Sequence, residues 1–388
     1  MMLRTVLWSA VACASVAGPA AAQDAYVIGV TGAMTGPSAG TLGPAVEGLR
    51  VYIDRLNAAG GVNGKPVKLV LQDDSSEPSK AAANTKKLLT QDNVILLINS
   101  SLSSTYAPML AETKRAEVPV LFVGSVCPKD VLPPTPDPLQ FCTTNFGQGF
   151  DSRAAIAFIK ETAKEPVKIG FASMAIPISR GEVEYAAEHA KSQGMTVTGH
   201  EVIPPPTPDY TPFATKLKEA GPNWVASWAP WVTEVRTVES LRRLGWEGNY
   251  IAIAHVEAEG ELSRLKDPKF FVMGANGFFV DNLPIHAEVR DAVKKANTKY
   301  PAEQMTEGWV GGMAIEAALK AVAWPPTPAK VVAAMNTLKV DTQGLRGAPI
   351  EWTKDNHYRT RQTYRIYSWD TAKSQILRVK DWIPYDVK

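Results

Sequence analysis

Short β-rich runs alternate with helical stretches along this chain, and the alternation occurs twice. The clearest run is VILLI at residues 94–98, which contains no polar residue. A run of this kind is typical of a parallel strand that helices cover on both faces. A first series of strands and helices covers about 26–123, and a second series begins near residue 167. We therefore expect an α/β fold with two lobes, each built on a doubly wound parallel sheet.

The positions of the elements follow from the spacing of the apolar residues. In the first series we expect strands at 26–30, 67–71, 94–98 and 119–123, and helices at 46–56, 80–89 and 106–116. In the second series we expect strands at 167–172, 195–202, 224–228 and 250–254, and helices at 182–191, 213–220 and 235–244. Gly147 and Gly149 indicate a linker between the two series. After them we expect helices at 286–299, 307–323 and 328–338, and antiparallel strands around a turn at Asp355 and Asn356.

Ligands of open α/β sheets bind beyond the carboxyl ends of the strands. Two sheets that face each other would place those ends on the two sides of a cleft. The segments that we expect there are 31–43, 99–105, 124–127, 173–180, 229–233 and His255. A binding site of this chain is therefore expected among these segments.

The first 22 residues have the pattern of a secretory signal peptide. A positive charge at Arg4 precedes an apolar run at 6–16 and small residues at 20–22. We expect a mature chain that begins near Gln23 and is exported to the periplasm. An alternative interpretation makes Cys13 the modified cysteine of a lipoprotein, although the residues before it fit that role poorly. No later stretch reaches 18 apolar residues, so we expect no membrane span.

Removal of the signal peptide would leave two of the three cysteines, Cys127 and Cys142. An even pair in an oxidising compartment favours a disulfide, which would close the proline-rich loop 128–141. The alternative is a reactive thiol at Cys127, but no histidine lies nearby in the sequence to activate it.

Charge and motif content argue against several classes of function. The 41 basic residues nearly balance the 39 acidic ones, and no run of five like charges occurs, so we expect no nucleic-acid partner. The sequence contains no Gly-x-Ser-x-Gly elbow, Walker loop, Cys-x-x-Cys or His-Glu-x-x-His motif. Asp73 and Asp74 could hold a metal, but a strand-end turn with a helix cap is the favoured interpretation. We expect no cofactor, no metal and no catalysis.

A hydroxyl-rich turn at 99–105 follows the buried 94–98 run and precedes a helix. Amide hydrogens at a helix start, together with the hydroxyls of Ser103 and Ser104, favour an anion site. Ser125 follows the next strand in the same way. Two donor-rich turns at neighbouring strand ends suit a carboxylate. Ordinary helix capping remains the alternative interpretation.

The chain resembles the periplasmic substrate-binding proteins of ABC importers, in the branched-chain amino acid (Leu/Ile/Val) group. The resemblance rests on GAMTGP at 32–37 and IDRLNAAGGVNGK at 53–65, and on the spacing of Asp73–Asp74, Pro78, Ala81 and 103–105. It implies a type I periplasmic binding protein fold, in which a three-strand hinge joins two Rossmann-like lobes. One lobe would comprise 24–145 and 278–346, and the other 146–277 and 347–388. It also implies an ABC permease as partner, and we expect a monomer.

The resemblance also implies where the ligand binds. In the first lobe the ligand carboxylate would be held at Ser103, Ser125, Val126 and Cys127, with Thr41 or Leu42 lining the same side. In the second lobe the aromatic ligand contact falls near Pro230 or Trp231. The preceding strand-end loop contributes Ile178 or Ser179.

One departure from the family pattern bears on the ligand. Amino acid binders place a carboxylate at the end of the strand that matches 250–254, but Ala254 and His255 stand there, and Glu257 is two residues late. A buried ammonium without a counter-charge is strongly disfavoured. Tryptophans near the expected cleft (Trp228, Trp231 and Trp309) favour a flat ligand. The alternative interpretation is that Trp224 and Trp228 alternate along their strand into the core. His255 either contacts the ligand or is an ordinary surface histidine.

We therefore expect an exported receptor that captures a small organic carboxylate, such as an aromatic acid, between its lobes and delivers it to an ABC permease. Import of a branched-chain amino acid is one alternative. A periplasmic sensor subunit that reports ligand to a regulator is another. An enzyme on the same sheet architecture is disfavoured, because no nucleophile, metal or nucleotide motif was found.

Overall fold

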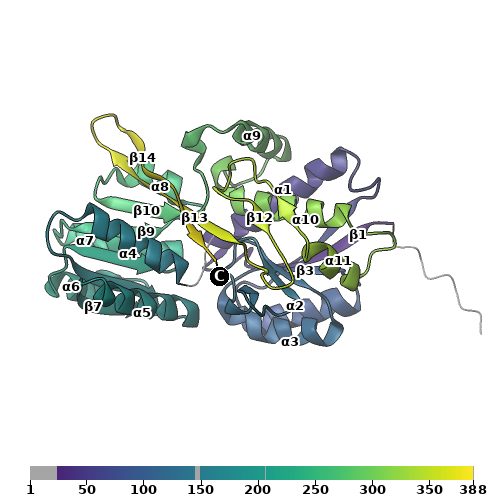
Figure 1. Cartoon of the computed structure of the whole chain (residues 1–388), viewed down its shortest axis with the longest axis horizontal. Coiled ribbons are helices and arrows are strands. Elements are labelled where there is room, and N and C mark those ends of the chain that lie inside the picture. Colours follow the sequence, from purple (N-terminus) through teal and green to yellow (C-terminus); the bar gives the residue numbers. More distant parts are fainter. Residues whose placement is uncertain (1–23, 145–148, 206, 388) are drawn as a thin grey trace, which may run out of the picture.

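The computed structural model describes residues 24–144, 149–205 and 207–387, and its two lobes lie side by side (Figure 1). The expected signal peptide and Gly147 lie outside the described residues. Within the described ranges, no helix combines the length and the apolar character needed to cross a membrane.

The first lobe is built on a parallel sheet with the strand order β2-β1-β3-β4-β5. Its strands are β1 (Tyr26–Gly32), β2 (Val67–Asp73), β3 (Leu96–Ser100), β4 (Val120–Phe122) and β5 (Gln140–Cys142). Its helices include α1 (Ala39–Ala58), α2 (Pro78–Thr90), α3 (Tyr106–Ala116), α9 (Pro284–Ala296), α10 (Thr306–Lys320) and α11 (Pro328–Met335). Both β1 and β3 are buried along their whole length, because α1 and α10 pack together in one apolar core and α2 and α3 contribute to another.

The second lobe is built on a mixed sheet with the strand order β14-β13-β10-β9-β8-β6-β7. The parallel strands are β6 (Lys168–Met174), β7 (Thr196–Ile203), β8 (Trp224–Trp228), β9 (Asn249–Ile253) and β10 (Phe270–Gly274). The last two strands, β13 (Arg361–Asp370) and β14 (Gln375–Asp386), form an antiparallel hairpin on the edge of this sheet (Figure 1). The helices of this lobe are α4 (Phe150–Thr162), α5 (Pro177–Ser192), α6 (Thr211–Glu219), α7 (Trp231–Arg243) and α8 (Ala258–Leu265).

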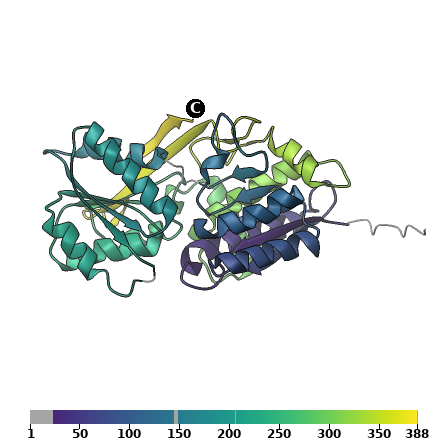
Figure 2. The ribbon, with the colours of Figure 1, turned by 90° about the horizontal axis from the view of Figure 1, so that it is seen from below.

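The chain passes between the lobes after β5, after β10 and before β13, and the described residues of these passages lie at the hinge between the lobes (Figure 2). Side-chain hydrogen bonds and an ion pair link these passages to one another and to α10. Glu307 on α10 accepts hydrogen bonds from Asn276 at 2.7 Å and from Arg346 at 3.0 Å, and the ion pair with Arg346 is almost fully buried. Arg359 donates to the carbonyl oxygens of Thr143 and Thr144. This arrangement confirms the predicted α/β fold with two lobes and a hinge.

Several local predictions are corrected by the structure. Helix α4 occupies 150–162, directly after the expected linker glycine Gly149, and no helix was expected there. Strands β5 and β10 and helix α8 were likewise not expected. A turn is present at 354–355, where Thr353 and Asn356 form an antiparallel bridge, but the long strands β13 and β14 form their hairpin around 371–374. The Asn356 side chain accepts hydrogen bonds from Tyr358 N and Arg359 N, and the segment before it forms a two-residue strand, β12 (Ile350–Glu351), with β11 (Lys339–Val340).

Candidate functional site

A cavity lies between the lobes at the carboxyl ends of their strands. It contains about 550 Å³ of empty space, including the part open to solvent. Its walls are formed by Ser38, Thr41, Leu42, Ser101, Leu102, Ser103, Gly124, Ser125, Val126, Ile176, Ile178, Trp228, Ala229, Pro230 and His255. The first nine come from the first lobe and the other six from the second, so a molecule in the cavity would contact both lobes.

Four helices begin at this cavity. Ser38, Ile176 and Pro230 are the N-cap residues of α1, α5 and α7, and α3 follows the short 3-10 helix η1 (Ser103–Thr105). None of these helix starts has a side-chain cap hydrogen bond. The N-terminal end of a helix carries a partial positive charge and free N–H groups. Together, the four helix starts favour an anionic group in the cavity.

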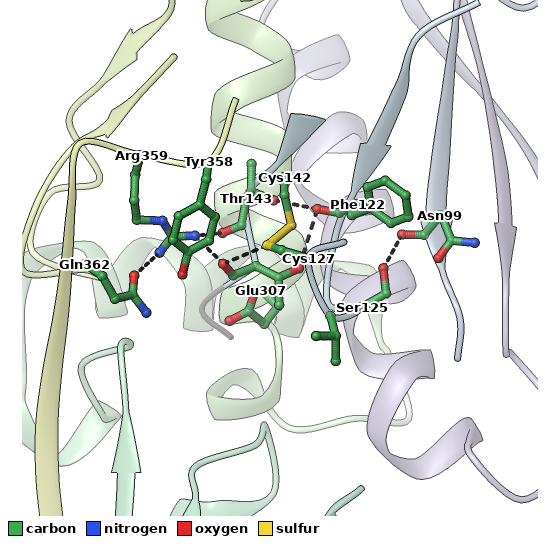
Figure 3. Close-up of a disulfide and its surroundings, with 12 residues drawn as sticks. Asn99, Phe122, Ser125, Cys127, Cys142, Thr143, Glu307, Tyr358, Arg359 and Gln362 are labelled. Carbon is green, nitrogen blue, oxygen red and sulfur yellow. Dashed lines mark hydrogen bonds between the residues drawn. A yellow bond between two sulfur atoms is a disulfide. The ribbon is translucent and has the colours of Figure 1, made fainter. Parts of the chain in front are cut away.

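The serines of the cavity wall differ in their bonding. Ser101 donates to Asp74 at 2.7 Å, and Ser125 donates to the carbonyl oxygen of Asn99 at 2.9 Å (Figure 3). The hydroxyl of Ser103 is buried and has no hydrogen-bond partner among the described residues. A buried hydroxyl without a partner is costly, and a ligand acceptor would satisfy it. Ser103 therefore offers the wall a buried hydroxyl that is available to a ligand.

Trp228 and His255 contribute uncharged polar side chains to the second-lobe wall of the cavity. The Trp228 indole Nε1 donates to the buried Asp151 at 2.9 Å, and Tyr364 donates to the other oxygen of the same carboxylate. His255 Nε2 lies 2.9 Å from the carbonyl oxygen of Ala229. Burial lowers the pKa of His255 to about 4, so this imidazole is neutral at pH 7.

No lysine, arginine, aspartate or glutamate is among the described residues of the cavity wall. A carboxyl group lies just outside it. Thr41 of the first lobe donates to Glu257 Oε1 of the second lobe at 2.8 Å, so this hydrogen bond crosses from lobe to lobe. Burial raises the pKa of Glu257 to about 7. Behind His255, Glu234 is fully buried, and burial raises its pKa well above the ordinary value.

The structure brings eight of the predicted site residues to the cavity wall. They are Thr41, Leu42, Ser103, Ser125, Val126, Ile178, Pro230 and His255. The other wall residues, apart from Trp228, lie in the segments expected at the strand ends, and Trp228 was noted only as a tryptophan near the cleft. Asp151 and Glu234 were not predicted from the sequence. Asp151 accepts from Trp228 and Glu234 accepts from Ile253 N, and spacing of apolar residues reveals neither of these contacts between distant residues.

Four predicted site residues do not line the cavity. Ser104 is exposed beside Ser103, because the 3-10 turn directs neighbouring side chains differently. Ser179 Oγ accepts from Met174 N and donates to the carbonyl oxygen of Trp228, so it holds the wall from behind. Trp231 is buried in the core of the second lobe against Phe270.

Cys127, the fourth of these residues, is bonded to Cys142 in a buried disulfide (Figure 3). Cys127 directly follows the wall residue Val126. Cys142 directly precedes Thr143, whose carbonyl oxygen accepts a hydrogen bond from Arg359 in the hinge. Trp309 also lies away from the cavity, fully buried against Tyr52 in the first lobe.

The adjacent carboxylates Asp73 and Asp74 are used within the fold. Asp73 accepts from Met34 N, Thr35 N and Ser75 N, and Asp74 accepts from the hydroxyls of Thr31 and Ser101 and from Ser76 N. These bonds match the strand-end turn that was favoured over a metal. In the described part of the chain, no group of three or more His, Cys, Asp or Glu residues could hold a metal ion.

The chain matches known proteins along most of its length. The sequence pattern of a family described as periplasmic binding protein matches residues 25–375. A Leu/Ile/Val-binding protein homolog 1 from Brucella melitensis biotype 1 is 26% identical over 228 residues, which is 58% of this chain and 59% of that protein. The matches span 27% to 59% of the length of the curated relatives.

Solved structures share the fold at low sequence identity. A branched chain amino acid ABC transporter structure from Thermus thermophilus with bound valine is 15% identical, with a TM-score of 0.80 over 94% of this chain and 97% of that chain. The solute binding protein of an ABC transporter from Rhodopseudomonas palustris BisB5, in complex with 3,4-dihydroxy benzoic acid, is 17% identical, with a TM-score of 0.79 over 94% and 98%. One structure thus holds an α-amino acid and the other an aromatic acid.

Proposed function

The chain belongs to the periplasmic binding protein family, as its sequence resemblance predicted, and on this premise we propose that it is an exported receptor for a small organic carboxylate without an ammonium group. Its lobes close on the ligand, and the closed form delivers the ligand to an ABC permease in the membrane. The receptor acts in the periplasm as a monomer.

The observation that carries this proposal is the chemistry of the cavity wall. Four helix starts and the unbonded Ser103 hydroxyl supply positive potential and a donor, which suit a carboxylate. The described wall residues offer no carboxylate to neutralise an ammonium. Trp228, Ile176 and Ile178 suit an apolar or aromatic body. The aromatic acid in the Rhodopseudomonas structure supports this ligand class.

Closure of the lobes provides the mechanism. Ser103 and the starts of α1 and α3 bind the carboxylate from the first lobe, and Trp228 and Ile178 cover the ligand from the second lobe. The ligand stabilises the closed form by as much as its affinity for that form exceeds its affinity for the open form.

A branched-chain amino acid is the second candidate. The relative named as a Leu/Ile/Val-binding protein homolog and the valine-bound Thermus structure support it. Glu257 supports it as well, because its carboxyl is hydrogen-bonded to the wall residue Thr41 and an ammonium needs such a partner.

Thermal unfolding of the mature protein in the presence of single compounds tests the two candidates. A ligand that binds only the folded form at 100 times its Kd stabilises that form by about 2.7 kcal/mol. We expect stabilisation by benzoate, 4-hydroxybenzoate or aliphatic acids, and none by leucine or valine. Stabilisation by leucine or valine alone would overturn the proposal in favour of the second candidate.

Ser103→Ala tests the anion site itself. Loss of a hydrogen bond to a charged group costs about 1.5–3 kcal/mol, so we expect the carboxylate Kd to rise at least tenfold. The matched control is Ser104→Ala, since Ser104 is exposed and does not line the cavity. Equal affinities of the two variants in isothermal titration calorimetry would place the anion elsewhere.

A further inference from the structure

A second, open depression lies beside the cavity, along the boundary between the lobes. It contains about 1480 Å³ of empty space, including the part open to solvent. Its first-lobe side is formed by the starts of η1 and α3 and by the loop at 128–132, and its second-lobe side by the starts of α4 and α5. We call it the seam groove.

The seam groove and the cavity share two wall residues. Ser103 of the first lobe and Ile178 of the second lobe line both spaces. They lie on opposite sides of the boundary, where η1 and α5 contact each other. The wall that separates the cavity from the seam groove therefore has one residue from each lobe. A small separation of the lobes would connect the cavity with the groove.

The wall of the seam groove is largely apolar. Leu132, Phe150 and Tyr185 lie on it; Tyr185 is 44% exposed, whereas Phe150 is only 7% exposed. The Tyr106 hydroxyl is already bonded to the carbonyl oxygen of Val126. The groove thus presents apolar surface to solvent directly beside the proposed carboxylate site.

Four charged side chains also line the groove, namely Lys129, Asp130, Arg153 and Glu182. Glu182 accepts hydrogen bonds from Gly149 N and from the amide and hydroxyl of Ser152, so its carboxylate is used at the start of α4. The Arg153 guanidinium lies over the Phe150 ring, 4.6 Å from its centre, and covers this ring, so the open apolar surface is that of Leu132 and Tyr185. Lys129 and Asp130 are exposed, and their charges are of opposite sign.

We propose that the seam groove is an extension of the ligand site. The carboxylate end of the ligand lies in the cavity near Ser103, and its chain passes between Ser103 and Ile178 and covers Leu132 and Tyr185. The ligand class is then an elongated apolar acid, such as a medium-chain fatty acid or an arylalkanoate. This inference rests on the proposed function and deepens it.

A length series of straight-chain carboxylates, from butanoate to decanoate, tests the proposal by calorimetry on the mature protein. Burial of one methylene contributes about 0.8 kcal/mol, which corresponds to about a fourfold gain in affinity. We expect a gain of about two- to fourfold for each methylene beyond the length that fills the cavity. Binding of short acids without any gain from added length would overturn the extension alone, whereas failure of every acid to bind would overturn the proposed function with it.

Two variants locate the chain in the seam groove. Tyr185→Ala should raise the Kd for decanoate about tenfold, because apolar contact area is lost. The Kd for butanoate should stay unchanged. Gly181→Trp should block decanoate and spare butanoate, because Gly181 lines the groove and a Cβ added there meets no atom within 4 Å. Gly260→Trp on α8 is the matched control, since Gly260 is also helical and equally open. Equal loss of decanoate affinity in both tryptophan variants, or none in either, would overturn the proposal.

Discussion

The hydrogen bond between Thr41 and Glu257 should make ligand binding depend on pH. Thr41 belongs to the first lobe and Glu257 to the second, so closure of the lobes brings them together. Glu257 Oε2 is buried and has no hydrogen-bond partner among the described residues. Desolvation of this carboxyl, with a smaller contribution from the nearby Glu261, raises its pKa from 4.5 to about 7. His255 stays neutral because burial lowers its pKa to about 4.

The sign of the effect follows from linkage. In the open form Glu257 regains water, so its pKa moves toward 4.5. Between pH 4.5 and 7 the closed form holds a proton that the open form has lost, so closure takes up a proton. Closure is therefore most favourable below pH 4.5, weakens as pH rises through 7, and is constant above that. The same sign applies to folding, because the folded-state pKa lies above the unfolded one.

The size of the effect is bounded by the shift in pKa. The difference between 7 and 4.5 corresponds to about 300-fold in affinity, at about 1.36 kcal/mol per unit. Part of the burial of Glu257 comes from its own lobe and remains when the lobes separate. The interval from pH 5 to pH 8 covers at most about 70-fold of this change, so we expect the Kd to rise by about 10- to 50-fold over it.

Calorimetry at several pH values and in buffers of different ionisation enthalpy measures both the affinity and the proton taken up. Glu257→Gln is the matched variant, because the amide oxygen can still accept from Thr41 but cannot titrate. Its affinity should be nearly independent of pH and equal to that of the wild type below pH 4.5. The reasoning is refuted if the wild type and the variant show the same pH profile, since that would place the titrating group elsewhere.

Three further changes test other parts of the structure. Trp228→Phe removes the indole bond to a buried carboxylate, so urea unfolding should show a loss of about 1–3 kcal/mol with weaker ligand binding; unchanged stability would contradict this. Glu307→Ala leaves the guanidinium of Arg346 buried without its ion pair, and we expect a loss of about 3–5 kcal/mol in the same assay, which an unchanged midpoint would refute. Replacing both Cys127 and Cys142 by serine opens a loop with a sequence separation of 15 and should cost about 3 kcal/mol relative to the oxidised protein; equal midpoints would show that the disulfide adds no stability.

The position of the site could be predicted from the sequence because it depends on topology. The 94–98 run indicated a strand with both faces covered, and the ends of parallel strands meet at one edge of a sheet. All wall residues except Trp228 fall in the segments 31–43, 99–105, 124–127, 173–180 and 229–233 or at His255. Trp228 is the last residue of its strand and misses the expected segment by one position.

The choice between neighbouring residues could not be predicted. Ser103 and Ser104 are chemically identical, and only the 3-10 turn directs Ser103 to the cavity and Ser104 to solvent. The contact between Asp151 and Trp228 joins residues 77 positions apart, so no local pattern reports it. Helix α4 was overlooked because Gly149 indicated a linker, whereas this glycine is the N-cap of the helix, with a φ of 73°.

The position of the Glu257 carboxyl could not be predicted from the sequence either, and it bears on whether the ligand carries an ammonium group. From sequence spacing, Glu257 stands two residues beyond the position where a carboxylate would meet an ammonium. The structure nevertheless directs its carboxyl to Thr41, at the edge of the cavity. With a pKa of about 7, this carboxyl is half protonated near neutrality. As a neutral acid it closes the lobes over an anionic ligand, whereas as a carboxylate it could pair with an ammonium.

A ligand with an ammonium should therefore depress the pKa of Glu257, and an amine-free acid should leave it raised. Proton uptake on binding between pH 5 and 7 would favour the amine-free acid, and proton release or no exchange would favour the amino acid. The direction of proton exchange thus decides between the two ligand classes even where both classes bind.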